Sequence, residues 1–294
     1  MQLKLLTTML LYKGQTVIIL SHKNPDVDSI ISGVLLQKLL CSLGYMAKYI
    51  IPDKAVDAES AQICLKYGIN PKDYLGDVPE NSILFLVDHY KTNISGNVVG
   101  SIDHHPTMEA IQYEYYMNKA SASTAMLIYS LNPSTFDVDD IKRVAIANLI
   151  DTNCFSSTKS VPADKDWTIQ MCKKNGFNYE ELYDDGLCLT NLSNLGKAST
   201  HGEKSYLYNG SKLKSSYVQF KCITLDVLQQ FIDILRQKLN QQELDMWVFI
   251  THNMAEFKTD AYLITVNGCE VIKYETVASR GSTIMPSIEK RFMA

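Results

Sequence analysis

The chain has 294 residues and a formal net charge of −4, with 46% hydrophobic and 20% charged residues. This composition is ordinary for a globular protein, and the length favours two domains over one. There is no long basic run, which disfavours a nucleic-acid partner held by many phosphate contacts, whereas a small phosphate substrate needs only a local cationic pocket.

The remaining bulk features favour a cytoplasmic protein without a membrane partner. No apolar stretch reaches the roughly 18 residues that a membrane span needs. The apolar N-terminus is short and lacks an A-x-A cleavage site, so we interpret it as an ordered first segment or an extension. The seven cysteines are scattered and include no C-x-x-C pair, which indicates reduced thiols rather than a zinc-thiolate site.

Short apolar runs alternate with helical patterns in the first half of the chain. The predicted elements are strand 16–20, helix 29–43, strand 46–51, helix 58–68, strands 82–87 and 97–102, helices 121–130 and 141–150, and a helix from Ala163. Such alternation predicts an α/β fold with a parallel sheet covered on both faces. Ligands bind to these sheets beyond the carboxyl ends of the strands.

A second domain is predicted in the C-terminal part of the chain. Asn, Ser, Gly and Thr accumulate at residues 189–204. This composition indicates a linker at 191–199, between a domain at 1–190 and a domain at 200–294. The predicted elements beyond it are strand 215–225, helix 225–242 and strands 245–253, 261–267 and 269–275. They predict a smaller α/β domain.

Histidines and aspartates gather where three predicted strands end. They are His22, Asp26, Asp28, Asp88, His89, Asp103, His104 and His105. One such histidine would be an ordinary satisfied polar residue, but parallel strands would bring the whole set to one edge of the sheet. Packed carboxylates repel one another unless a cation lies among them. Mixed imidazole and carboxylate ligands suit manganese, iron, cobalt or zinc, and a shared carboxylate would hold two ions about 3.5–4 Å apart.

The turn before the first long helix fixes two of these carboxylates. Pro25 stiffens it, so that Asp26 and Asp28 have fixed directions. Asp28 lies at the predicted helix start, where free amides and the helix dipole favour an anion. The alternative is that Asp28 is a simple N-cap, but capping would explain neither Asp26 nor His22.

Four motifs now carry a family resemblance. They are H-x-N-P-D-x-D-S at 22–29, V-D-H at 87–89, D-H-H at 103–105 and an aspartate after a helix at Asp151. In this order they resemble the DHH phosphoesterase superfamily, and the first motif is most similar to the family II manganese-dependent inorganic pyrophosphatases. Exopolyphosphatases of the superfamily generally lack this opening. The resemblance runs from about Val17 to Phe292.

The resemblance implies a role for each ligand. His22 and Asp26 would bind one metal ion, Asp28, His104 and Asp151 the other, and Asp88 would bridge them. The ions would be two Mn²⁺, with Co²⁺ or Mg²⁺ as substitutes. His105 would face the substrate phosphate and supply a proton, while Asp103 and His89 would orient the ligands. From the residues alone, Asp151 is the weakest assignment, because an aspartate after a helix is commonly solvated.

The second domain would then resemble the DHH-associated domain that binds substrate. The phosphate-binding residues implied are Lys204 in HGEKSY and Ser279-Arg280 in VASRGSTIMP. Gly281 stands where the family carries a lysine, so one expected phosphate contact is missing. Without the resemblance, Lys204 and Arg280 would be interpreted as solvated surface charges.

The implied function is metal-dependent hydrolysis of inorganic pyrophosphate to two phosphates, by a water that two metal ions activate. The catalytic residues would be His105, Asp88, Lys204 and Arg280. The alternative is an exopolyphosphatase or another DHH phosphoesterase acting on short polyphosphate or a small phosphoester, which Gly281 keeps open. A non-catalytic relative would have lost ligands, yet every ligand position is filled. The resemblance also implies a homodimer.

Overall fold

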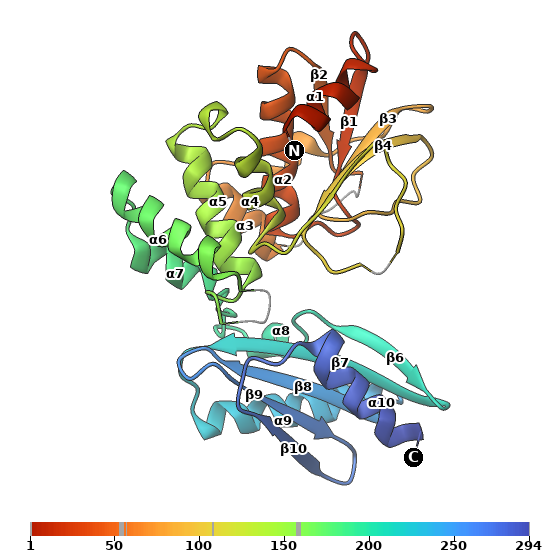
Figure 1. Cartoon of the computed structure of the whole chain (residues 1–294). Helices are drawn as coiled ribbons and strands as arrows, with labels where there is room; N and C mark the ends of the chain where they lie inside the picture. Colours follow the sequence, from red (N-terminus) through yellow and green to blue (C-terminus); the bar gives the residue numbers. More distant parts are fainter. Residues whose placement is uncertain (1, 53–55, 57, 108, 157–159, 294) are drawn as a thin grey trace. The chain divides into compact units, whose positions relative to one another are not determined.

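The computed structural model describes residues 2–52, 56, 58–107, 109–156 and 160–293. The chain divides into two compact units, Met1–Gly186 and Leu187–Ala294, which we describe separately (Figure 1). The division lies four residues before the predicted end of the first domain at 190. The predicted linker at 191–199 falls within unit 2, because Leu192, Leu195 and Ala198 pack into its core. No helix in the described residues is long and apolar enough to cross a membrane.

The first unit contains a five-stranded parallel sheet, as predicted. Its strand order is β2-β1-β3-β4-β5. The strands are β1 (Thr16–Leu20), β2 (Met46–Ile50), β3 (Ile83–Val87), β4 (Asn97–Asp103) and β5 (Tyr115–Asn118). The bounds of each predicted strand agree with those of the observed strand within one residue, but β5 was not predicted. Since all five strands are parallel, their carboxyl ends lie at one edge of the sheet.

Helices cover one face of this sheet in layers. They are α2 (Val27–Ser42), α3 (Ala58–Lys66), α4 (Thr124–Leu131), α5 (Val138–Asp151), α6 (Pro162–Asn175) and α7 (Tyr179–Gly186). Helix α2 packs on β1, β2 and β3, α5 packs on α2 and α4, and α6 and α7 pack on α5 (Figure 1). The first helix, α1 (Gln2–Leu10), contacts the edge strand β5. Helix α2 therefore joins the sheet to the outer helices.

The opposite face is also covered, but mainly by irregular segments. Its apolar cluster contains Ile18, Leu20, Ile50, Leu84 and Leu86. Residues from the connections, including Ile94 and Tyr113, pack over this cluster. The described residues between β3 and β4, and between β4 and β5, form no helix. The predicted covering of both faces is therefore correct, although helices do not supply both layers.

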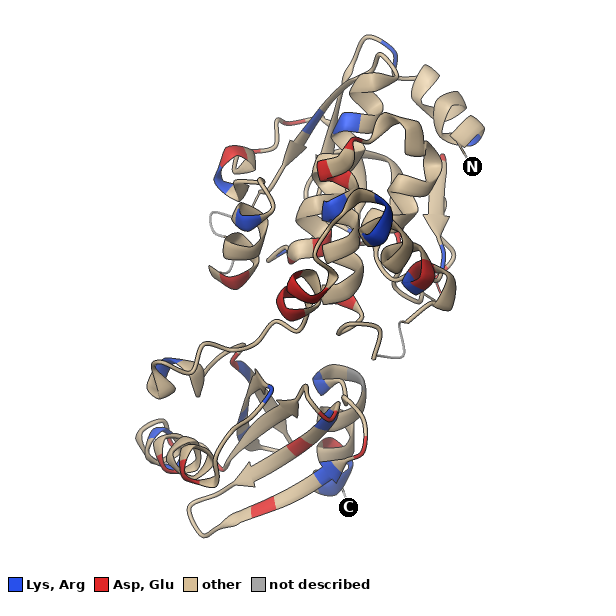
Figure 2. Cartoon of the chain, turned by 90° about the vertical axis from the view of Figure 1, so that its left-hand side faces the viewer, with Lys and Arg blue, Asp and Glu red and all other residues tan. Residues whose placement is uncertain are grey.

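The second unit contains a mixed five-stranded sheet with order β10-β9-β8-β7-β6. Its elements are α8 (Leu195–Ala198), β6 (Lys204–Tyr208), β7 (Ser211–Phe220), α9 (Leu225–Gln241), β8 (Met246–Asn253), β9 (Lys258–Ile264), β10 (Cys269–Tyr274) and α10 (Met285–Met293). Alternate residues of β8 point to opposite faces, so Trp247 and Phe249 pack with α9, while Val248 and Ile250 pack with α10. Basic and acidic segments are interspersed in both units (Figure 2). The α/β prediction for this part of the chain is confirmed.

Gly33 allows α2 to approach β2 closely, so we expect Gly33→Ala to destabilise the protein. A Cβ at position 33 would lie 2.2 Å from Cε2 of Tyr49. Overpacking of this kind costs about 1–3 kcal/mol, which exceeds the gain of about 1 kcal/mol in helix propensity. Urea denaturation should show a lower free energy of unfolding. In a Tyr49→Ala background the same substitution should cost little, and an equal loss in both backgrounds would contradict this packing.

Candidate metal centre

The register of the parallel sheet brings the predicted ligand residues together. Leu20 pairs with Leu86, and Val87 pairs with Ile102, so β1, β3 and β4 end at the same level. The chain beyond these ends supplies His22, Asp88 and His104. At the same edge, the start of α2 supplies Asp26 and Asp28, and the end of α5 supplies Asp151. All six predicted metal ligands thus belong to one cluster in the first unit.

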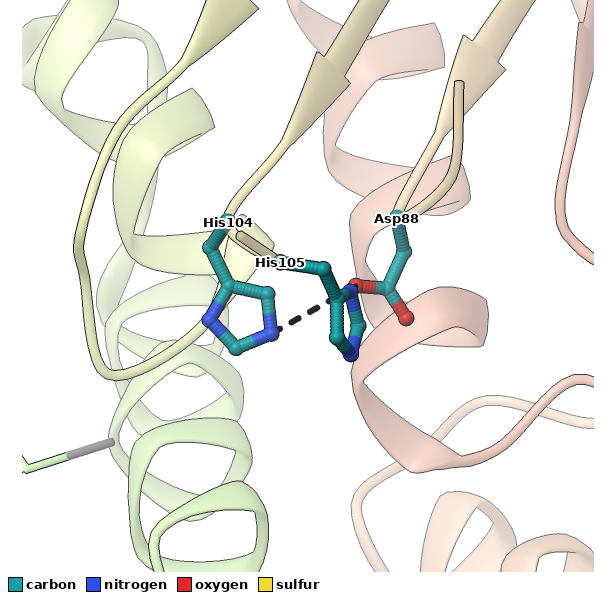
Figure 3. Close-up of side chains that lie close together, drawn as sticks. All are labelled: Asp88, His104 and His105. Carbon is teal, nitrogen blue, oxygen red and sulfur yellow. Dashed lines mark ion pairs between the residues drawn. The ribbon is translucent and has the colours of Figure 1, made fainter. Parts of the chain in front are cut away.

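Asp88 lies at the centre of this cluster. Its Oδ2 is 3.4 Å from Nε2 of His22, and its Oδ1 is 3.7 Å from Nε2 of His104 and 3.6 Å from Nδ1 of His105 (Figure 3). The side chain is 1% exposed. The backbone of Asp88 has a φ of 65°, in the left-handed region that is costly for a residue other than glycine. Asp88 consequently presents one carboxylate to histidines on both sides.

Hydrogen bonds fix the ring orientation of both flanking histidines. Nδ1 of His22 lies 2.9 Å from the carbonyl oxygen of Lys23, and Nδ1 of His104 lies 2.9 Å from that of Ser121. A carbonyl can only accept, so each Nδ1 carries the proton and donates it. In the neutral ring, Nε2 then presents a lone pair toward the carboxylates. Metal-bound histidines commonly have this arrangement.

Three carboxylates surround Nε2 of His104. Oδ2 of Asp151, the last residue of α5, is 3.2 Å away, and Oδ1 of Asp88 and Oδ2 of Asp28 are 3.7 and 3.9 Å away. Around His22 the partners are Asp88 and Asp26, whose Oδ2 lies 3.9 Å from Nε2. The two groups have Asp88 in common.

Asp26, rather than Asp28, is the N-cap of α2, since its side chain accepts the amide of Ser29 at 3.0 Å. Asp28 instead accepts the amides of Thr124 and Ala125 at the start of α4, at 2.7 and 3.0 Å. The N-cap interpretation of Asp28 is therefore wrong. Each carboxylate oxygen has two acceptor positions, so these bonds leave Oδ2 of Asp28 able to bind a cation as well.

Without a cation, the cluster is electrostatically unfavourable. Burial and the charges of Asp151 and Asp26 raise the pKa of Asp28 to about 7. Burial and the charge of Asp28 likewise raise the pKa of Asp88 to about 7. Burial opposes protonation of His22, but the approach of Asp88 and the charge of Asp26 outweigh it, and its pKa rises to about 9. A divalent ion would relieve this repulsion.

Unpaired buried atoms provide a separate test of whether a cation fits. Nε2 of His104 is buried and has no hydrogen-bond partner among the described residues, although Asp151 lies nearby. Oδ2 of Asp88 is also buried without a hydrogen-bond partner among the described residues, and Nε2 of His22 lies 3.4 Å from it. Buried polar atoms of this kind normally have partners. The donor set and its unpaired atoms therefore fit divalent metal.

His105 and Asp103 form a pair beside the cluster. Oδ1 of Asp103 lies 2.9 Å from Nδ1 of His105 and also accepts its backbone amide at 3.0 Å. Burial would raise the pKa of Asp103, but the contacts with His105 outweigh it and the pKa falls. The His105 side chain is 40% exposed, so it is the accessible histidine of the D-H-H motif. Asp103 orients the ring.

His89 lies against the cluster without ligating geometry. Its Nδ1 is 2.9 Å from the carbonyl oxygen of Val87, and burial lowers its pKa to about 4. Its own carbonyl accepts the hydroxyl of Ser101 at 2.7 Å. His89 therefore fixes the chain next to Asp88.

In the second unit, Lys204 and Arg280 lie near each other. The charge of Arg280, with partial burial, lowers the pKa of Lys204. The Arg280 guanidinium donates to the carbonyl of Gly202 and lies 5.3 Å from the Tyr217 ring centre. Ser279 precedes Arg280 and accepts the amide of Thr283 through its carbonyl. Two neighbouring cations favour an anion, and the phosphate-binding role of these residues stays a prediction.

Sequence reasoning did not assign a role to Thr124. Its amide donates to Asp28, and its hydroxyl donates to Oδ1 of Asp88 at 2.9 Å. The signal was the three hydroxyl residues Ser121, Ser123 and Thr124 at the start of a predicted helix, which favour N-capping. The sequence could not show that α4 would hold two distant carboxylates, one from α2 and one from the end of β3.

Part of this chain matches a known protein family, and several known proteins are similar to it. Residues 16–156 match the DHH family, N-terminal domain. A protein of Lactobacillus acidophilus, named "Probable manganese-dependent inorganic pyrophosphatase", is 22% identical over 266 residues, covering 84% of either chain. The "Manganese-dependent inorganic pyrophosphatase" of Methanocaldococcus jannaschii is 24% identical over 315 residues, covering 93% of this chain and 98% of the relative.

A solved structure shows the same fold. It is a Methanococcus jannaschii protein described as a candidate family II inorganic pyrophosphatase, with a TM-score of 0.61 and 22% identity, covering 95% of this chain and all of the other. The matched family segment begins at β1 and ends just beyond Asp151, so it includes every predicted metal ligand. Within the first unit, residues 16–156 therefore match the N-terminal domain of the DHH family.

Proposed function

We propose that this chain is a manganese-dependent hydrolase that splits inorganic pyrophosphate into two phosphates. The observation that carries the proposal is the buried carboxylate of Asp88, which faces both His22 and His104. A carboxylate in that place would bridge two cations. The names of the relatives suggest manganese and pyrophosphate.

The proposed ligands divide around Asp88. One ion would be held by His22, Asp26 and Asp88, and the other by Asp28, Asp88, His104 and Asp151. Two bound Mn²⁺ ions, or Co²⁺ or Mg²⁺ in their place, would polarise a phosphate oxygen and lower the pKa of a water toward neutrality. The chain's own part is to fix the ligand directions, through the Nδ1 bonds of both histidines and the amides of α4.

His105 is the proposed proton donor and phosphate contact. Asp103 accepts a hydrogen bond from Nδ1, so Nε2 is the ring atom that exchanges a proton with the substrate. The negative charge of Asp103 stabilises the protonated ring, which favours donation to a leaving phosphate. Lys204 and Arg280 are the proposed groups that neutralise phosphate charge.

A second candidate function is hydrolysis of short polyphosphate or a small phosphoester. Gly281 keeps it open, because no cationic side chain follows Arg280 and an added Cβ would meet nothing within 4 Å, so there is space beside Arg280 for a longer substrate. Competition among pyrophosphate, tripolyphosphate and a nucleoside triphosphate, compared by kcat/KM, separates the two candidates.

The homodimer expected from the resemblance stays part of the proposal. Sedimentation equilibrium tests it independently of activity. A monomer would leave the hydrolytic proposal unchanged, because all six proposed ligands come from one chain.

Metal removal tests the proposed function directly. Protein freed of metal with a chelator should release no phosphate from pyrophosphate, and Mn²⁺ should restore the release. Because the ion binds only the folded chain, Mn²⁺ at 100 times its dissociation constant should add about 2.7 kcal/mol to the free energy of unfolding. Phosphate release that persists after complete chelation would contradict the proposal, and so would stabilisation by Mn²⁺ with no turnover of any phosphate substrate.

We expect Asp88→Ala to lower kcat/KM for pyrophosphate by at least about 1,000-fold, or about 4 kcal/mol of transition-state stabilisation. The reason is that both proposed ions lose a shared ligand. Steady-state phosphate release measures the loss. Asp77→Ala, at an exposed position of the same unit, is the control and should change little. Wild-type turnover in Asp88→Ala would exclude a bridging carboxylate.

We expect Lys204→Ala to raise KM by about 10- to 100-fold while kcat falls less, because one charge-assisted contact is worth about 1.5–3 kcal/mol. Initial rates over a range of pyrophosphate concentrations give both constants. Lys212→Ala, at an exposed residue of β7, provides the matched control. An unchanged KM in Lys204→Ala would remove this lysine from the phosphate-binding residues.

A further inference from the structure

We propose that Asp164, on α6, is a positioning residue that orients His104 toward the metal. The inference rests on the proposed metal centre and deepens it. Asp164 is not part of any of the motifs that carry the family resemblance, and it lies beyond the matched segment, which ends at 156. Its role would therefore not be found from the motif pattern.

A single carboxylate oxygen of Asp164 binds the segment at residues 121–122, and this segment in turn binds His104. Oδ2 accepts the hydroxyl of Ser121 at 2.8 Å and the amide of Ala122 at 2.7 Å. The carbonyl of the same Ser121 accepts Nδ1 of His104 at 2.9 Å. The orientation of the imidazole thus depends on the position of the peptide between Ser121 and Ala122, and Asp164 holds this peptide through the Ala122 amide and the adjoining Ser121 hydroxyl.

The contact is part of a buried polar network that ties α6 to α4 and α5. The hydroxyl of Thr168 donates to the carbonyl of Asp164 and accepts Nδ2 of Asn148, at 2.8 and 3.1 Å. Oδ1 of Asn148 accepts the hydroxyl of Ser123, which in turn accepts the amide of Met126 in α4. Thr168, Asn148 and Ser123 are fully buried. Every donor in this series meets an acceptor, so the network has one consistent orientation.

This network links the elements that supply the second group of ligands. Helix α4 holds Asp28 and Asp88 through Thr124, and α5 ends at Asp151. The segment at 121–122 holds His104. Asp164 and Thr168 connect all three from α6. Loss of Asp164 would free the Ser121 peptide, and Nε2 of His104 would then sample directions away from the three carboxylates.

The alternative is a purely structural role, in which Asp164 only stabilises the first turn of α6, because an acidic residue is favourable at a helix N-terminus. That role would affect folding, but it would not depend on whether position 164 can accept hydrogen bonds from the 121–122 segment. Asparagine keeps an acceptor oxygen of the same reach, whereas alanine does not. The two substitutions therefore separate positioning from a charge effect.

The test measures Mn²⁺ binding to metal-free full-length protein by isothermal titration calorimetry, and it needs no catalytic turnover. Partners that orient a metal ligand are worth about 10- to 100-fold in metal affinity, and Asp164→Ala should weaken one of the two binding steps by that factor. Asp164→Asn should restore most of the affinity. Asp166→Ala removes an exposed carboxylate from the same helix and should bind as the wild type does.

Three results would overturn the proposal: unchanged affinity in Asp164→Ala, an equal loss in Asp166→Ala, or a loss shared equally by both binding steps. If the wild type binds no divalent ion, the positioning role is also excluded. Protein that binds two Mn²⁺ ions but does not hydrolyse pyrophosphate would contradict only the proposed function. Ser121→Ala, which leaves the Ala122 contact intact, should give a smaller loss and guards against misfolding of Asp164→Ala.

Discussion

Mutual repulsion among buried carboxylates is the constraint on which the first unit depends. Asp28 and Asp88 are 2% exposed, and Asp151 lies beside them against the same imidazole. Burial of several like charges is unfavourable, and two features of the chain offset this repulsion. The chain directs the amides of α4 at Asp28, and it leaves nitrogen lone pairs and carboxylate oxygens facing a common space. That space suits a divalent ion, so the polar groups that make the unit unfavourable without metal are those proposed to act in hydrolysis.

Strands β1 and β3 could be predicted from the sequence because each is a short, almost wholly apolar run followed directly by a polar residue. Ile83–Val87 is buried along its whole length, and Asp88 follows it at once. Parallel pairing then required the polar residues to meet, which is why the ligand cluster could be predicted before its geometry was known. The edge strand β5 was missed, since four residues with two tyrosines give no periodicity.

Other features could not be read from the sequence because they depend on contacts between distant segments. Asp164 meets Ser121 across a separation of 43 residues, and the capping of α4 by Asp28 spans 96. In the second unit, Asn, Ser and Gly around α8 indicated a linker, yet the apolar side chains among them pack against α9 and β8. Local composition cannot distinguish a connecting segment from a short covering layer, because the difference lies in what the few apolar residues contact.

The second unit has a complete apolar core on each side of its sheet, with α9 on one and α10 on the other. The packing that places Lys204 and Arg280 is therefore supplied within residues 187–294. Since the proposed cation ligands all come from residues 22–151, the proposed metal centre and the proposed phosphate-binding residues are encoded in separate stretches of the gene. A substitution in the second stretch, at Gly281 for example, can therefore alter the proposed phosphate contacts and leave the proposed ligands in place, so substrate preference and metal dependence can change independently of each other.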